Sequence, residues 1–81
     1  MRGFKTVKGE NGMANMGNII KQLRKKNGLT QSDFARILRV TPQAVSKWER
    51  SQGYPDITML PRIAECFGVS MDILFGISNI V

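Results

Sequence analysis

The chain contains 81 residues, with 12 Lys and Arg against 6 Asp and Glu, so its formal net charge is +6. This length allows one small domain. One cysteine and no histidine exclude an internal disulfide and leave no usual set of zinc ligands, so we expect no metal and no cofactor. There is no apolar run near the about 20 residues that a membrane helix needs, and no signal peptide, which favours a cytoplasmic protein. The positive charge favours a nucleic acid as partner, although solubility would account for it equally well.

Residues 1–15 combine glycines with scattered charges and show no hydrophobic periodicity, so we expect this segment to be disordered. Two interpretations remain open. The segment is either a leader before a natural start at Met13 or Met16, or a basic arm. In the second case Arg2, Lys5 and Lys8 contact a groove of the nucleic acid.

Residues 16–26 form the first predicted helix. Its apolar stripe consists of Met16, Ile20 and Leu23. Its last turn is basic, which opposes the helix dipole, and Gly28 follows as a C-terminal cap. The second helix starts near Thr30, whose hydroxyl can cap it, and Asp33 stands where a capping box needs an acidic residue.

The central stretch, residues 31–48, is typical of two short helices joined by a tight turn. One face of the first helix carries Phe34, Ala35 and Leu38. Thr41 is a strong N-cap residue, and Pro42 suits the first position of the second helix. Val45 and Trp48 share one face of that helix, so we expect Trp48 to pack in the core rather than stack on bases. The pattern is that of a helix-turn-helix, whose second helix can lie in the major groove of DNA.

Residues 52–55 are predicted to form a loop. Asp56 then caps a fourth helix that ends at Gly68, and Pro61 near its first turn suggests a tight or kinked start. The apolar face of this helix consists of Leu60, Ile63, Ala64 and Phe67. We expect Cys66 to be a half-buried packing residue rather than a reactive thiol.

A short fifth helix, residues 71–75, is predicted to be capped by Ser70 and ended by Gly76, and an apolar tail, residues 77–81, follows. Five short helices, no strands and no repeats predict an all-α domain over residues 16–76.

Many residues of this domain match a known family in register and without gaps. They are Leu23, Arg24, residues 28–31, Phe34, Ala35, Leu38, Val40, Thr41, residues 45–49, Pro55, Asp56, Leu60, Ile63, Ala64, residues 67–70 and residues 72–74. On these residues the domain resembles the Cro/phage-repressor type of helix-turn-helix domain, the Xre family. The resemblance implies a five-helix lambda-repressor-like fold. It also implies a sequence-specific DNA-binding regulator that usually acts as a homodimer on a palindromic operator.

The resemblance implies site residues as well. The exposed face of the third helix is expected to contact base edges through Pro42, Gln43, Ser46 and Lys47. A glutamine can pair with adenine and a lysine can reach guanine. Phosphate contacts, which fix register rather than sequence, are expected from Gln31, Arg39, Thr41, Arg50 and Tyr54.

Two further positions bear on the fold. Arg24 and Glu49 stand where the family has an ion pair that holds the third helix against the body of the domain. Arg39 departs from the family pattern, because its position is usually a glycine with positive φ. An arginine there should carry strain of about 1 kcal/mol.

We therefore expect a DNA-binding transcriptional regulator that acts by binding and without catalysis, and among regulators we favour a repressor. The alternative is an antitoxin-type module that binds DNA and also a partner protein. The apolar residues that motivate this alternative are Leu74, Phe75, Ile77, Ile80 and Val81. The same residues could form a dimer interface or cover the core. RNA binding lacks support, because the sequence shows no array of exposed aromatic residues.

Overall fold

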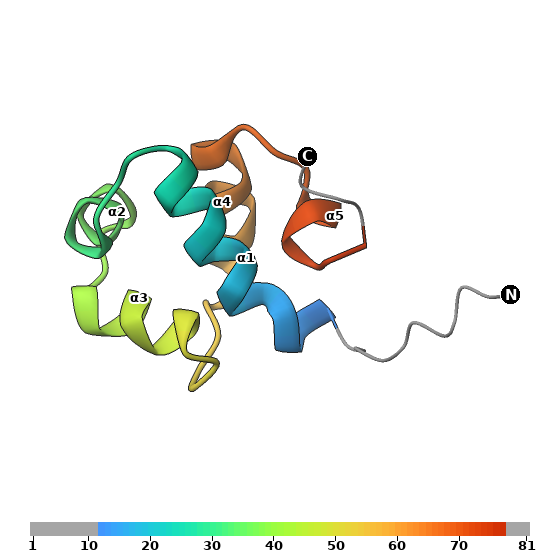
Figure 1. Cartoon of the computed structure of the whole chain (residues 1–81), viewed down its shortest axis with the longest axis horizontal. Coiled ribbons are helices and arrows are strands. Elements are labelled where there is room, and N and C mark those ends of the chain that lie inside the picture. The colour runs from blue at the N-terminus through green and yellow to red at the C-terminus, as the bar shows by residue number, and fades with distance from the viewer. Residues whose placement is uncertain (1–11, 78–81) are drawn as a thin grey trace, which may run out of the picture.

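A computed structural model of the chain describes the backbone of residues 12–77 and the side chains of residues 16–77. This part of the chain is helical and contains no strand. Its elements are α1 (Gly12–Lys26), α2 (Gln31–Leu38), α3 (Pro42–Glu49), the 3-10 helix η2 (Ile57–Met59), α4 (Leu60–Phe67) and α5 (Met71–Leu74). The predicted all-α fold is confirmed. Figure 1 shows α1 in the middle of the domain, with α2 and α3 on one side and α5 on the other. None of these described helices is long and apolar enough to cross a membrane.

The first helix is longer than predicted, because α1 begins at Gly12 rather than at Met16. Met13 and Ala14 are good helix formers, and Met16 is fully buried, so the turn before it is attached to a packed residue. The helix ends at Lys26, as predicted, with basic residues in its last turn. The expectations for residues 1–11, including the arm of Arg2, Lys5 and Lys8, lie outside the described residues.

The core lies between the five α-helices, and the apolar stripes that the sequence indicates are all buried in it. The rings of Phe34 and Phe67 stack with their centroids 4.9 Å apart and so join α2 to α4. Trp48 is 7% exposed, which confirms that it packs in the core. Cys66 is half-buried against this core, also as predicted, and burial raises the pKa of its thiol.

The C-terminal apolar residues divide between the core and the surface. Leu74 is fully buried and Phe75 packs against the core, so these two cover it. Ile77 is 72% exposed, and Ile80 and Val81 lie outside the described residues. Ser70 occupies the N-cap position of α5 as predicted, but its side chain makes no capping hydrogen bond in the described structure.

The other helix starts follow their sequence signals. Thr30 Oγ1 accepts a hydrogen bond from the Asp33 N–H, and the Asp33 carboxylate accepts one from the Thr30 N–H, both at 2.9 Å. The predicted capping box is therefore present, and these bonds hold the pKa of Asp33 below its usual value. Asp56 accepts a hydrogen bond from the Thr58 N–H at 3.2 Å, so it caps η2 rather than α4. This 3-10 turn is the tight start that Pro61 predicts.

The five α-helices of the described chain end in the same way. A residue with left-handed backbone follows each helix, and the next N–H reaches back to a carbonyl in the last turn, which is a Schellman motif. Glycine takes the left-handed position after α1, α4 and α5. After α2 it is Arg39 (φ 62°), and after α3 it is Ser51 (φ 60°). The positive φ expected at Arg39 is confirmed, and both turns that flank α3 use side chains that such a backbone disfavours.

The helices α1 and α3 cross closely, and this contact holds the buried side of α3 in place. Gly17 of α1 is buried, and a Cβ atom at this position would collide with the backbone carbonyl oxygen of Trp48 in α3. Only a residue without a side chain allows the two backbones to come this close. This role of Gly17 was not predicted, because a glycine within an amphipathic pattern carries no information about which helix will cross there.

Candidate nucleic-acid interface

α3 has one buried and one exposed face, as the helix-turn-helix pattern predicts. Val45 is fully buried and Trp48 nearly so. Gln43 and Lys47, one helical turn apart, are both exposed. Ser46 is half-buried, so of the expected base-contacting residues it has the least surface to offer.

The start of α3 is fixed by local chemistry. Thr41 Oγ1 accepts a hydrogen bond from the Ala44 N–H at 3.1 Å, which caps the helix. Pro42, exposed, follows in the first turn, where a missing N–H has no cost. The exposed face of α3 therefore begins at a defined residue.

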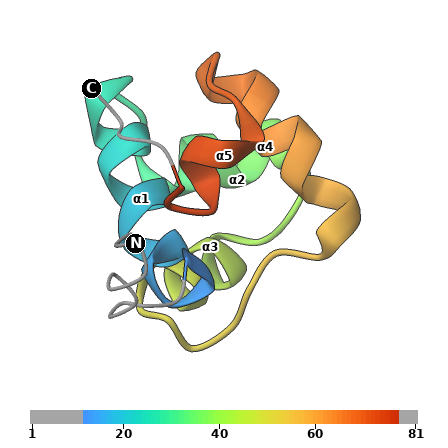
Figure 2. The same ribbon diagram turned by 90° about the vertical axis from the view of Figure 1, so that its right-hand side faces the viewer.

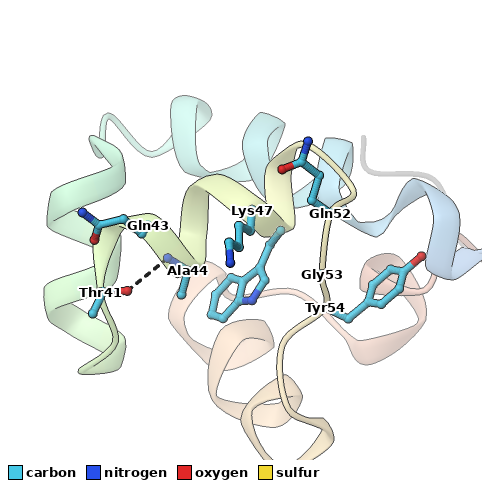
Figure 3. Close-up of a pocket in the computed structure, with 8 residues that line it drawn as sticks. Thr41, Gln43, Ala44, Lys47, Gln52, Gly53 and Tyr54 are labelled. Carbon is cyan, nitrogen blue, oxygen red and sulfur yellow. Dashed lines mark hydrogen bonds between the residues drawn. The ribbon is translucent and has the colours of Figure 1, made fainter.

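A groove with a volume of about 410 Å³ runs between α3 and the loop that follows it. Its walls are Thr41, Gln43, Ala44, Lys47, Trp48, Gln52, Gly53 and Tyr54. Figure 3 shows Gln43 and Lys47 on the helix, with Gln52, Gly53 and Tyr54 on the loop that leaves its end. In Figure 2 this loop, in yellow, leaves α3 and runs round the domain towards α4. The groove brings four expected contact residues together. Gln52 was missed, because the sequence does not reveal that the loop after α3 forms one wall of a groove.

The other expected contact residues are not part of the wall of this groove. Arg39 is exposed in the turn before α3. Arg50 is exposed at the end of α3, where its Nε donates to the Ser46 carbonyl oxygen at 3.3 Å. An exposed arginine thus precedes α3 in the chain and another follows it. Tyr54, which is part of the wall of the groove, is 49% exposed.

The ion pair expected between Arg24 and Glu49 is present. Arg24 Nε lies 2.7 Å from Glu49 Oε2, and Arg24 Nη2 donates to Glu49 Oε1 at 3.0 Å. The side chains of Arg24 and Glu49 are 9% and 2% exposed, so the pair is buried. It joins the last turn of α1 to the last residue of α3 and holds α3 against the body of the domain.

Gln31, expected at a phosphate, is also part of this ion-pair cluster. Its Nε2 donates to Glu49 Oε1 at 3.0 Å. Arg24 Nη1 in turn donates to the Leu29 carbonyl oxygen, at 2.8 Å, just before α2. The cluster therefore connects α1, the start of α2 and the end of α3.

The electrostatics of the cluster favour the charged forms of both partners. Burial alone would raise the pKa of Glu49, but hydrogen bonds from Arg24 and Gln31 outweigh it, so its pKa is lowered. The hydrogen bond to Glu49 raises the pKa of Arg24. Both groups are therefore ionised at neutral pH.

The tight turn between α2 and α3, and the groove along the exposed face of α3, define a helix-turn-helix domain of the kind that transcriptional regulators carry. The chain belongs to the helix-turn-helix family HTH_3, whose sequence model matches residues 20–74.

Two curated relatives carry regulator names. The chain is 40% identical over 57 residues to the HTH-type transcriptional activator BcrR of Enterococcus faecalis, which covers 70% of this chain and 28% of the relative. It is 33% identical over 61 residues to the HTH-type transcriptional regulator ImmR of Bacillus subtilis (strain 168), and this match covers 75% of this chain and 48% of the relative. The chain thus spans less than half of either relative.

Solved structures share the fold. A transcriptional regulator of the HTH_3 family from Vibrio cholerae superimposes with a TM-score of 0.67 at 28% identity, over 79% of this chain and 36% of that one. Hydroxypropylphosphonic acid epoxidase from S. wedmorenis gives a TM-score of 0.70 at 28% identity, over 76% of this chain and 33% of the epoxidase chain. The second match covers a third of an enzyme, so the fold also occurs as one part of a larger protein.

Proposed function

We propose that this chain is a transcriptional regulator that binds double-stranded DNA specifically and places the exposed face of α3 in the major groove. The observation that carries the proposal is the pair Gln43 and Lys47, exposed one turn apart on a helix whose opposite face is buried. An α-helix fits the major groove, and its exposed polar side chains then face the base edges. The net charge of +6 favours the same polyanion.

In this proposal the base contacts come from one face of α3. Gln43 pairs with the N6 and N7 atoms of adenine, and Lys47 donates to the O6 or N7 atom of guanine. Pro42 and Ser46 lie beside them. The ring of Pro42 offers apolar contact, for instance to a thymine methyl group, and Ser46 contributes the least because it is half-buried.

The phosphate contacts surround this face. Arg39 and Arg50 supply positive charge before and after α3, and Thr41 and Tyr54, which line the groove beside Gln43 and Lys47, contact the sugar–phosphate backbone. Gln31 adds a contact from the first residue of α2. Such contacts set the register of the protein on the duplex and are independent of sequence.

We further propose that two copies bind a palindromic operator with their α3 helices about one helical turn apart. The protein then represses transcription by blocking access to the promoter. It acts in the cytoplasm, where bacterial DNA is accessible, and by binding alone.

A second candidate function is an antitoxin-type module that also binds a partner protein. The observation that favours it is the exposure of Ile57 (74%) and Ile77 (72%) on the described surface. Exposed apolar side chains mark a protein interface when they form a contiguous patch. Co-purification of a small partner protein with the chain would support this second function.

Selection of duplexes from a random DNA pool tests the proposal. The expected result is an enriched, palindromic sequence that contains adenine and guanine at fixed positions in each half. Recovery of random sequences after several rounds would overturn sequence-specific binding. An enriched but non-palindromic site would overturn the dimer and retain the α3 contact.

A further inference from the structure

Glu49 contacts two residues with different roles. One is Arg24, its partner in the buried ion pair, and the other is Gln31, a proposed phosphate contact. Its carboxylate accepts three hydrogen bonds, two from Arg24 and one from Gln31 Nε2. The side chain of Glu49 is only 2% exposed, and Gln31 as a whole residue is half-buried. One oxygen, Oε1, accepts from both partners, at 3.0 Å each.

The bond to Glu49 restricts a side chain that is otherwise flexible. A glutamine loses considerable rotamer freedom when it is ordered. If the side chain is already ordered in the free protein, DNA that contacts the glutamine does not pay this entropy cost, and its affinity is higher. A carboxamide nitrogen carries two hydrogens. One binds Glu49, and the other remains to donate to an oxygen outside the protein.

The ion pair also removes an electrostatic obstacle. A lone carboxylate beside a phosphate would repel it. Here the two hydrogen bonds from Arg24 neutralise the charge of Glu49, so that Glu49 can hold Gln31 without presenting an unpaired negative charge to the DNA.

We infer that Glu49 is a positioning residue for DNA binding: through Gln31 Nε2 it fixes the Gln31 carboxamide, before DNA arrives, in the orientation that donates to a backbone phosphate. This inference rests on the proposed function, because it needs Gln31 at a phosphate. It assigns the ion pair a role in affinity besides its role in holding α3.

The test is a thermodynamic cycle of DNA affinities in two backgrounds, the wild-type chain and the Arg24→Met/Glu49→Leu variant. The variant replaces the buried pair by apolar side chains, which usually preserves a fold. In the wild-type chain, Gln31→Ala should weaken binding to the selected duplex about fivefold, the value of one hydrogen bond. In the variant background the same substitution should change affinity by less than about twofold. An equal loss in both backgrounds overturns the inference.

Lys47→Ala is the matched control, measured in both backgrounds. Lys47 lies on the exposed face of α3, and its contribution should be the same with and without the ion pair. If the variant background abolishes the effects of Lys47→Ala and Gln31→Ala alike, Glu49 acts by placing the whole of α3, and the inference is wrong. A further outcome also overturns the inference. If Lys47→Ala weakens DNA binding in the otherwise wild-type chain but Gln31→Ala does not, the inference is wrong and the proposed function still holds.

A second measurement does not depend on whether the variant folds. The side-chain amide order parameter of Gln31, measured by NMR in the free wild-type protein, should be high and should hardly change when DNA is added. A value below about 0.6 in the free protein, the range of flexible groups, would contradict the inference.

Discussion

Gly17 of α1 lies directly against the backbone carbonyl of Trp48 in α3, so the two helices touch backbone to backbone. Gly17→Ala should destabilise the domain by about 1–3 kcal/mol, because neither backbone can move aside as a flexible side chain would. The better helix propensity of alanine, worth about 1 kcal/mol, does not compensate for this collision. Urea unfolding measures the effect. The control is Asn18→Ala at the next, exposed position, which should leave stability unchanged or higher. An equally stable Gly17→Ala variant would show that α1 and α3 do not cross so closely.

Arg39→Gly should raise the free energy of unfolding by about 0.5–1 kcal/mol. Arg39 has a φ of 62°, which glycine adopts without strain. The same substitution removes a positive charge and should weaken DNA binding. Arg39→Ala separates the two effects, because it removes the charge and keeps the strain. We therefore expect Arg39→Ala to bind DNA as weakly as Arg39→Gly without the gain in stability.

The buried ion pair should respond differently to loss of one partner and of both. Glu49→Ala leaves the Arg24 guanidinium buried without its carboxylate, which costs about 3 kcal/mol. Replacement of both partners, in Arg24→Met/Glu49→Leu, leaves no buried charge and should cost less. Thermal and urea unfolding of the two proteins give the comparison. A single variant as stable as the double one would mean that water already solvates the pair.

Acid should weaken the fold partly through Glu49. The pKa of Glu49 in the folded chain lies below its ordinary value of 4.5. The stability that this carboxylate contributes is therefore fully present above the pKa of the unfolded chain, and it is lost as the pH falls through the lower folded pKa. Urea unfolding from pH 7 to pH 3 should show a smaller loss of stability in Arg24→Met/Glu49→Leu than in the wild-type chain. Identical losses would assign the acid sensitivity to other groups, such as Asp33, whose pKa is also lowered.

Sequence preference should depend on Gln43 and Lys47. Gln43→Ala and Lys47→Ala should each weaken the selected duplex by about 1–3 kcal/mol, relax preference at one base pair of each half-site, and affect a scrambled duplex little. Arg50→Ala should weaken both duplexes together and reduce the slope of log affinity against log salt by about one. Titrations at several salt concentrations compare the three. If Gln43→Ala and Lys47→Ala reduce binding to both duplexes equally, α3 does not read bases.

The sequence predicts well the features that depend on local pattern. The apolar spacing identifies which face of each helix is buried, and Thr30 and Thr41 mark the starts of α2 and α3. The Arg24–Glu49 pair was available only through the family resemblance, because the two residues lie 25 positions apart.

Features that depend on tertiary contacts were not predictable. The close crossing at Gly17 requires knowledge of which helices meet, and the contact of Gln31 with Glu49 requires their relative placement. The groove has the loop at Gln52 as one of its walls, and a local sequence pattern does not indicate this placement. The earlier start of α1 reflects the packing of Met16, which the sequence shows only as an apolar residue.

The crossing at Gly17 also bears on how such a domain could change its target. The constraints on α3 come from within: a backbone contact on its inner side, the ion pair at Glu49 and the cap at Thr41. None of these involves the side chains of Gln43 or Lys47, which point away from the core. These two positions can therefore be exchanged for other polar residues at little thermodynamic penalty to the scaffold. A library randomised at Gln43 and Lys47 should consist largely of folded proteins with differing DNA preferences, which would make this domain a suitable frame for engineered recognition.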